Sequence, residues 1–476
     1  METKPEILIY MSDQHSAVTQ HSTADSIVET PFLDELGKRA YVFDNAYTSC
    51  PLCVPARASF MTSRLPSEIG VFSNADDFKS SEITFPHLLG ANGYHSTLIG
   101  RMHLVGPDQL HGFDEHVGKD ITAPIWGTPG SGRKDWGEYR KGFAAKTTMS
   151  VLGTGDSPVL EFDRHVETWT RDTLDNCNGD EPQLFVVGTY GPHFPYVGDR
   201  ELMEKYLEKE PLSEDKACRV HPGTAKHVIE ATARQKAIAR AAYRSLVEIQ
   251  DRHIESVYNE FRKYLDRRGR KGIFIYLSDH GDMCGKRDMY GKKVFYEPSS
   301  HIPLYMEIIG ELGHHIRSSV SIMDVGPTLA EITGSPEFPV ADGRSFLSLL
   351  AGEDEERFAL SEFYEEDINP YHGLLVHRNG KKMITYSGHE GMDELYDSEN
   401  DVEEMDELSG RENKLKKELT YIATPYMDEA EMRISQFKLN REKPRILNLY
   451  GSTRQERNIP STDMLSFEGK TPEPIN

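Results

Sequence analysis

One short segment, residues 50–62, combines a cysteine, an arginine and a helix start in an arrangement that suits an oxyanion. It reads Cys-Pro-Leu-Cys-Val-Pro-Ala-Arg-Ala-Ser-Phe-Met-Thr. Pro55 suits the first position of a helix, so we expect Cys53 in the turn that leads into that helix. Backbone N–H groups at a helix N-terminus attract anions, and the guanidinium of Arg57 adds further donors. The segment therefore offers a nucleophile beside a site for a tetrahedral oxyanion.

The spacing Cys50-x-x-Cys53 alone leaves several interpretations open. A redox pair, half of a metal site, a structural pair and chance all fit, because the chain has no second Cys-x-x-Cys. The longer pattern Cys-x-Pro-x-Arg over residues 53–57 is far more specific.

Four apolar segments are typical of buried strands in a parallel sheet, and polar residues follow each of them. The segments span residues 7–11, 96–99, 184–188 and 272–277. The carboxyl ends of such strands face the ligand crevice of an open α/β sheet. One Asp at a strand end is most often a turn or cap residue, but four polar ends argue for a shared site. The polar residues concerned are Asp13, Gln14, Arg101, His103, His193, Asp279 and His280.

Oxygen donors dominate the candidate metal ligands. Asp13, the amide oxygen of Gln14 and Asp279 suit Ca²⁺ or Mg²⁺, and His280 completes the set. Taken alone, His280 would be a core or capping histidine. With one histidine and no demonstrable thiolate, a zinc site is the weaker hypothesis.

These motifs, taken in order, resemble those of type I sulfatases of the alkaline phosphatase superfamily. The resemblance spans roughly residues 5–400 and is closest to the choline-sulfatase-like and phosphonate monoester hydrolase-like branch. The motifs are Asp13-Gln14, Cys53-x-Pro-x-Arg57, Gly100-Arg101-Met102-His103, Pro192-His193-Phe194-Pro195, Ser278-Asp279-His280-Gly281, Gly291-Lys292, Tyr296-Glu297 and His301-Ile302-Pro303.

The resemblance implies a catalytic aldehyde and a bound cation. A formylglycine-generating enzyme or an anaerobic maturase would convert Cys53 to formylglycine (3-oxoalanine), whose hydrate attacks sulfur, and Arg57 would support that hydrate. The cation would be Ca²⁺, with Mg²⁺ or Mn²⁺ as alternatives, and its ligands would be Asp13, Gln14, residue 53, Asp279 and His280. Sulfate oxygens or the leaving alcohol would be met by Arg101, His103, His193 and Lys292.

Substrate class is less constrained by the resemblance. Asn74 resembles an active-site asparagine of the choline-sulfatase branch, and Trp126 could line a pocket for a quaternary ammonium or a sugar, although simple loop packing fits it equally well. Choline sulfate, a sulfated sugar and an aryl sulfate all stay open as substrates. The alternatives are a phosphonate monoester or phosphodiester hydrolase on the same scaffold, and a catalytically silent ligand-binding relative.

Three residues depart from the family pattern. Ala56 replaces the commonest serine of the signature, so maturation depends on the converting enzyme. Arg101 replaces a lysine and cannot serve as an acid, which shifts that role to His103 or His193. Gln14 replaces an aspartate and lowers the negative charge of the metal site.

Composition narrows the class of protein and its compartment. The 476 residues include 77 acidic and 54 basic ones, for a net charge of −23, which argues against nucleic acid or an anionic membrane as partner. Five cysteines do not suggest a disulfide framework. The apolar run at residues 7–11 is too short for a signal peptide, and no run is long enough to span a bilayer. We therefore expect a cytoplasmic protein.

The predicted fold is α/β, with a large, mostly parallel sheet flanked by helices and a smaller C-terminal α+β subdomain. We expect a catalytic domain over residues 1–350, an antiparallel-sheet subdomain with a helix over 351–440, and a tail or arm over 441–476. A long amphipathic helix is predicted for 230–265 with Gly269 as its stop, and a last helix for about 412–423, before Pro425. Because members of this branch are often oligomers, the tail could reach a neighbouring subunit of a homo-oligomer.

Overall fold

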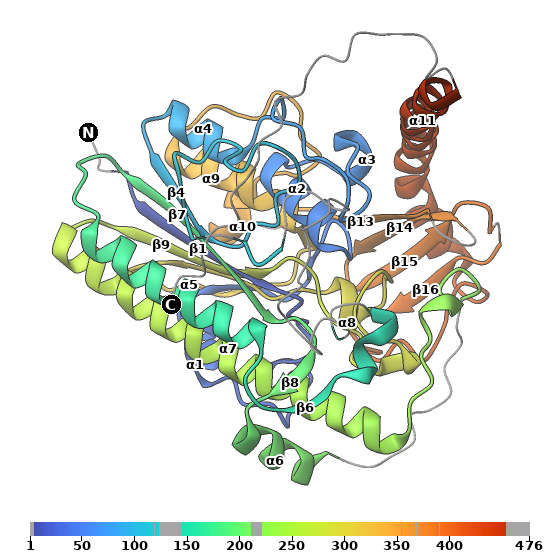
Figure 1. The fold of residues 1–476 in the computed structure, drawn as a ribbon, viewed down its shortest axis with the longest axis horizontal. Coiled ribbons are helices and arrows are strands. Elements are labelled where there is room, and N and C mark those ends of the chain that lie inside the picture. Colours follow the sequence, from blue (N-terminus) through green and yellow to red (C-terminus); the bar gives the residue numbers. More distant parts are fainter. Residues whose placement is uncertain are drawn as a thin grey trace.

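The computed structural model describes residues 4–118, 120–122, 142, 145–210, 221–353, 355–366, 370–389 and 391–453. Its centre is an eight-stranded sheet in the order β11-β2-β10-β9-β1-β7-β4-β5 (Figure 1). The five strands from β9 to β5 are parallel, whereas β10 runs antiparallel to both of its neighbours. Along the sheet the strands are β11 (His315–Ile316), β2 (Tyr41–Phe43), β10 (Leu304–Ile308), β9 (Gly272–Ser278), β1 (Glu6–Asp13), β7 (Gln183–Pro192), β4 (His95–Gly100) and β5 (Glu115–Val117).

Helices cover both faces of this sheet, which explains why its central strands are apolar throughout. One apolar cluster joins one face of the sheet to α1 (Pro31–Gly37), α5 (Pro158–Asn176) and α7 (Ala233–Arg268). Another joins the opposite face to α2 (Cys53–Thr62), α4 (Phe85–Ala91) and α9 (Val325–Thr333). All eight residues of β1 are buried, as expected of a strand between two helical layers.

Shorter elements connect these layers. The remaining helices of the main body are α3 (Pro66–Ile69), α6 (Arg200–Lys209), α8 (Glu297–Ser300) and α10 (Leu347–Leu350). Two small parallel pairs join β3 (Ala46–Tyr47) to β12 (Val320–Ser321) and β6 (Leu152–Thr154) to β8 (Tyr196–Gly198). In the described ranges, 3-10 helices span Ala145–Ser150, Ala225–His227, Lys286–Asp288 and Ile322–Asp324.

The long helix α7, predicted for residues 230–265, spans Ala233–Arg268 and stops at the predicted Gly269. Thr232 and Gln235 form a reciprocal capping box at the N-terminus. Gly269 ends the helix at φ 60, a left-handed conformation that favours glycine. The helix leads directly into β9, which carries Asp279 just beyond its carboxyl end.

A second, antiparallel sheet follows the main body, as predicted. It is a four-stranded meander of β13 (Ala359–Glu365), β14 (Tyr371–Arg378), β15 (Lys381–Tyr386) and β16 (Glu394–Asp397). Lys382 of β15 ties it to the main body, since its buried Nζ lies 2.7 Å from Glu297 Oε1 and 3.1 Å from the carbonyl oxygen of Phe295. The predicted boundaries near residues 350 and 440 stay predictions.

The last helix differs from its prediction. Helix α11 spans Asn413–Thr453, so the expected end at residue 423 is wrong, and the predicted 441–476 tail begins inside the helix. A proline inside a helix costs about 3 kcal/mol because one backbone hydrogen bond is lost. Pro425 lies on the exposed side, where water can hydrate the freed carbonyl, while Leu419, Ala423 and Ala430 are buried on the other side. Packing of that face against β14, β15 and α3 sustains the helix.

None of the helices in the described ranges is long and apolar enough to cross a membrane.

Candidate active site

Cys53 is the first residue of α2, so the helix begins two residues earlier than the sequence predicts. Leu52, in an extended conformation, is the N-cap, and Pro55 therefore falls inside the first turn, where its missing N–H costs no helical bond. The Sγ atom of Cys53 is buried 2.8 Å from Lys292 Nζ, 3.3 Å from His280 Nε2 and 3.8 Å from Asp13 Oδ1. Burial raises the pKa of the Cys53 thiol, and the carboxylate of Asp13 adds to that shift.

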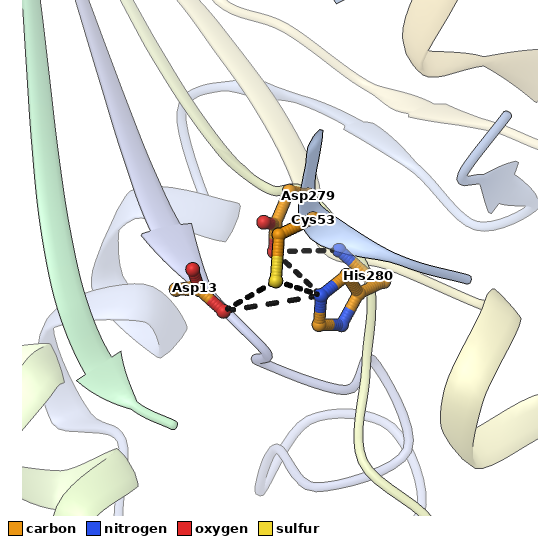
Figure 2. Close-up of side chains that lie close together, drawn as sticks. All are labelled: Asp13, Cys53, Asp279 and His280. Atoms are coloured by element: carbon orange, nitrogen blue, oxygen red, sulfur yellow. Dashed lines mark hydrogen bonds and ion pairs between the residues drawn. The ribbon is translucent and has the colours of Figure 1, made fainter. Parts of the chain in front are cut away.

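Four side chains that could hold a cation converge at the carboxyl ends of two adjacent strands. Strands β1 and β9 pair in parallel with Ser12 opposite Ser278, so the residues that follow them, Asp13 and Asp279, lie side by side. Together with Cys53 and His280 they offer ligand atoms that all lie within 4.8 Å of one another (Figure 2). All four residues are buried. The convergence predicted from the strand ends is therefore found.

Gln14 borders the same group and has one unused polar atom. Its backbone has φ 72, a strained value for a non-glycine residue, and its N–H donates to Asp279 Oδ1 at 3.0 Å. Its Nε2 donates to Asp282 Oδ2 at 2.5 Å. Within the described ranges its buried Oε1 has no hydrogen-bond partner. A buried, unpaired carbonyl oxygen on a residue that contacts Asp279 fits a cation ligand.

Arg57 braces both carboxylates from the first turns of α2. Its Nε donates to Asp279 Oδ2 at 2.8 Å and its Nη2 to Asp13 Oδ2 at 3.2 Å. Burial alone would raise the pKa of Asp13, but Arg101, Lys292 and nearby cations together hold it well below its usual range. Asp13 is therefore ionised at neutral pH and available to a cation.

Arg101 uses most of its donors within the protein. Its Nε donates to Asp13 Oδ2 at 2.9 Å, and its Nη1 donates at 2.8 Å to both Asp120 Oδ1 and Thr122 Oγ1. Its Nη2 lies 2.7 Å from His103 Nδ1. Since a guanidinium has no acceptor, His103 Nδ1 must accept this bond, which leaves the ring proton on Nε2.

His103 and His193 are buried imidazoles whose pKa values are both influenced by the carboxylate of Asp13. Burial and then Arg101 hold the pKa of His103 well below its usual range, and its Nε2 has no partner among the described residues. His193 Nδ1 lies 2.6 Å from the carbonyl oxygen of Phe194, and burial followed by Lys292 lowers its pKa strongly. Both rings are therefore neutral before an anion enters the site.

The two predicted substrate-binding residues have different outcomes. Asn74 Oδ1 accepts the N–H of Val54, the second residue of α2, at 3.0 Å, so this side chain caps the helix that carries Cys53. Trp126 lies outside the described residues.

Two carboxylates that support these side chains were not singled out from the sequence. Asp282 holds Gln14, and Asp120 holds Arg101 and accepts the His103 N–H at 2.7 Å. Asp282 is three residues beyond Asp279 in the same motif, which was a usable signal. Asp120 lies in a loop after β5 without any motif, so nothing in the sequence marked it.

Comparison with known proteins identifies the family. A model of the family described as Sulfatase matches residues 5–335, and one described as N-sulphoglucosamine sulphohydrolase, C-terminal, matches residues 285–423. The chain is 32% identical over 436 residues to a choline-sulfatase of Rhizobium meliloti (strain 1021), covering 85% of this chain and 82% of that protein. It is 25% identical to an arylsulfatase of Clostridium perfringens (strain 13 / Type A), with 90% and 95% covered.

Solved structures support the same fold. The phosphonate monoester hydrolase of Agrobacterium radiobacter superposes with a TM-score of 0.70 at 19% identity, covering 90% of this chain and 96% of that one. The predicted α/β architecture is thereby confirmed. Because the Sulfatase model spans well over half of the chain, this chain belongs to the sulfatase family and is a sulfuric ester hydrolase.

Proposed function

We propose that this protein hydrolyses sulfate monoesters after Cys53 has been converted to formylglycine by a maturation enzyme, with a divalent cation bound beside it. The observation that carries the proposal is the position of Cys53 Sγ. It lies at the start of α2, buried among Asp13, Asp279 and His280 and 2.8 Å from Lys292 Nζ. In the converted residue a hydroxyl of the aldehyde hydrate stands in for this sulfur.

The ligand set favours a hard cation. Asp13, Asp279 and Gln14 supply oxygen, and His280 supplies a neutral nitrogen because burial lowers its pKa to about 4. Such a set suits Ca²⁺, with Mg²⁺ or Mn²⁺ as alternatives. When bound, the cation would withdraw electron density from the reacting group as a Lewis acid.

Charge balance supports an anionic substrate. Around the two carboxylates Asp13 and Asp279 lie three cations: Arg57, Arg101 and Lys292. A sulfate monoester carries one negative charge over three oxygens, and fixed cations stabilise the charge that shifts during transfer. Lys292 is the cation closest to the reacting atom, since its Nζ contacts Sγ directly.

The leaving alcohol needs a proton, and two histidines are suited to deliver it. His103 has its Nε2–H fixed by the bond from Arg101 to Nδ1 and has no competing partner for that proton among the residues described. A sulfate bound nearby places negative charge beside the ring and raises its pKa from the depressed value of the free site. To act as the acid, His103 would take up a second proton at Nδ1 in place of the bond from Arg101, and then release the Nε2 proton to the leaving oxygen. Acid catalysis then falls to His103 or His193, because Arg101 cannot release a proton.

Choline sulfate is the first substrate to examine, because the relative of 32% identity is named choline-sulfatase. Aryl sulfates and sulfated sugars follow. The structural likeness to a phosphonate monoester hydrolase supports one rival, the hydrolysis of phosphonate or phosphate esters on the same scaffold. A ratio of kcat/KM for phenyl phosphonate ester over phenyl sulfate well above one would favour that rival.

Peptide mass spectrometry across Cys53 tests the proposal directly. Protein co-produced with a formylglycine-generating enzyme should contain the mass of the aldehyde or its hydrate at residue 53, and sulfate ester hydrolysis should vanish in Cys53→Ala. An unmodified thiol despite an active maturation partner, or undiminished turnover by Cys53→Ala, would reject the formylglycine mechanism. Complete conversion without turnover of any ester would point to a silent relative.

A further inference from the structure

We propose that Asp282 is a positioning residue of the cation site, which fixes the side-chain amide of Gln14 so that its Oε1 is presented as a ligand. The inference rests on the cation site proposed above and adds to it a residue that binds no cation itself.

Gln14 is held at every polar atom except one. Its N–H donates to Asp279 Oδ1 at 3.0 Å, and its carbonyl oxygen accepts the hydroxyl of Tyr243 at 2.6 Å. Its Nε2 is bound to Asp282 Oδ2 at 2.5 Å. Only Oε1 has no partner in the described part of the chain, although it is buried. An unpaired buried carbonyl oxygen is costly, and next to the anionic ligand set of Asp13 and Asp279 a bound cation would satisfy it.

Asp282 determines which end of the amide faces which way. Its carboxylate also accepts the Tyr196 hydroxyl at 2.8 and 2.9 Å, and the backbone N–H groups of Cys284 and Gly291, both at 2.8 Å. These donors keep it in place as an acceptor at 1% exposure. A carboxylate accepts only, so the amide must turn its NH₂ to Asp282 and its oxygen away from it.

The pair also explains how a neutral residue can serve at a position where many sulfatases have an aspartate. Gln14 brings no charge to the ligand set, but the carboxylate of Asp282 polarises its amide from behind. Outer residues that orient metal ligands typically change metal affinity 10–100-fold when they are removed. The negative charge is then carried by Asp282, behind the ligand, and not by the ligand itself.

Calorimetric titration of Ca²⁺ into chelator-treated protein measures this effect without reference to turnover. Asp282→Asn lets the amide of Gln14 flip, because asparagine offers both a donor and an acceptor, and Ca²⁺ should bind roughly 10–100-fold more weakly than to wild type. The matched control is Asp324→Asn, since Asp324 is equally a buried acceptor of two backbone N–H groups but lies at the start of α9. Its Ca²⁺ affinity should equal that of wild type.

A charge exchange separates positioning from folding. Gln14→Glu alone puts two carboxylates in contact and should also weaken Ca²⁺ binding. In the double variant Gln14→Glu with Asp282→Asn, the new amide donates to the new carboxylate, and Ca²⁺ affinity should return to within a few-fold of wild type. Thermal unfolding with chelator present identifies any variant that is not folded, and Gln14→Leu, which leaves Asp282 intact, should then show the same loss as Asp282→Asn.

Three results would overturn the inference: wild-type affinity in both Asp282→Asn and Gln14→Leu, an equal loss in Asp324→Asn, or no recovery in a folded double variant. Failure of wild-type protein to bind Ca²⁺, Mg²⁺ or Mn²⁺ would instead reject the cation site on which the inference rests.

Discussion

Replacing Lys292 with methionine should separate the binding of sulfate from the binding of the cation. The ammonium is buried, with Nζ 2.8 Å from Cys53 Sγ and 3.8 Å from Asp13 Oδ1. Burial alone would lower the pKa of Lys292, but Cys53 and Asp13 raise it above its ordinary value, so the group is a full cation at neutral pH. Methionine keeps the length of the side chain and removes the charge.

The size of the effect follows from the loss of one preorganised donor at the reacting atom. Such losses cost about 10²–10³ in kcat, equivalent to about 3–4 kcal/mol of transition-state stabilisation. We therefore expect kcat/KM for 4-nitrophenyl sulfate to fall by roughly that factor. The cation should respond in the opposite direction: removal of a like charge beside Asp13 leaves Ca²⁺ affinity equal or higher.

The assay compares Lys292→Met with Lys293→Met in fully converted protein. Lys293 is the next residue, half-exposed, with Nζ 3.8 Å from Glu365 Oε2, and its variant should keep wild-type kcat/KM. A fall of less than threefold in Lys292→Met would refute the role of this ammonium. A fall accompanied by weaker Ca²⁺ binding would show that Lys292 supports the cation site rather than the sulfate.

Three further outcomes are expected. In His103→Gln, turnover of alkyl sulfates should fall at least tenfold more than that of 4-nitrophenyl sulfate, because only the poor leaving group needs the proton; equal losses would exclude His103 as the acid. Removal of divalent cations by a chelator should abolish turnover, and Ca²⁺ should restore it, whereas full activity after exhaustive chelation would contradict the cation site. Burial raises the pKa of Asp251 from 3.8 to about 7 despite the N–H groups of Phe32 and Leu33, so the folded state binds this proton more tightly than the unfolded state. The protonated carboxyl therefore contributes its full stabilisation below about pH 4, and this contribution is lost as the pH rises to 7. In urea unfolding, the free energy of unfolding of wild type relative to that of Asp251→Asn should fall by about 2–3 kcal/mol between pH 5 and 8. A difference that stays constant over this range would contradict the shifted pKa.

Much of the candidate site was predictable because parallel strands impose a common edge. Apolar runs predicted the strands β1 and β9, and in a parallel sheet the residues that follow such strands, here Asp13 and Asp279, lie at the same carboxyl edge. Asp13 and Asp279 are neighbours because Ser12 pairs with Ser278 across the two strands. This register depends on the tertiary structure and cannot be predicted from the apolar runs alone. Helix α7 was predictable for a similar reason, since its period and its terminal Gly269 are local signals.

What escaped prediction depends on contacts between distant parts of the chain. The hydrogen bond between Gln14 and Asp282 joins residues 268 positions apart, and no spacing rule predicts it. Helix α11 continues through Pro425 because one of its faces packs on the second sheet, whereas a proline rule considers only the backbone. Local rules thus identify the elements, and packing decides where they end and which polar groups meet.

The three cations of the site do not have equivalent roles, although the sequence presents them alike. In the described part of the chain, Arg101 donates four of its five N–H groups to protein acceptors. There Arg57 donates three, to Asp13, Asp279 and the carbonyl oxygen of Arg101. Among the described residues Lys292 donates one hydrogen bond, to Cys53 Sγ, which leaves two donors for a ligand. The guanidinium groups are therefore suited to hold the carboxylates and the His103 tautomer in place. In the mechanism that we propose, direct contact with a sulfate falls mainly to Lys292 and His103, so an arginine in place of lysine at position 101 is compatible with it.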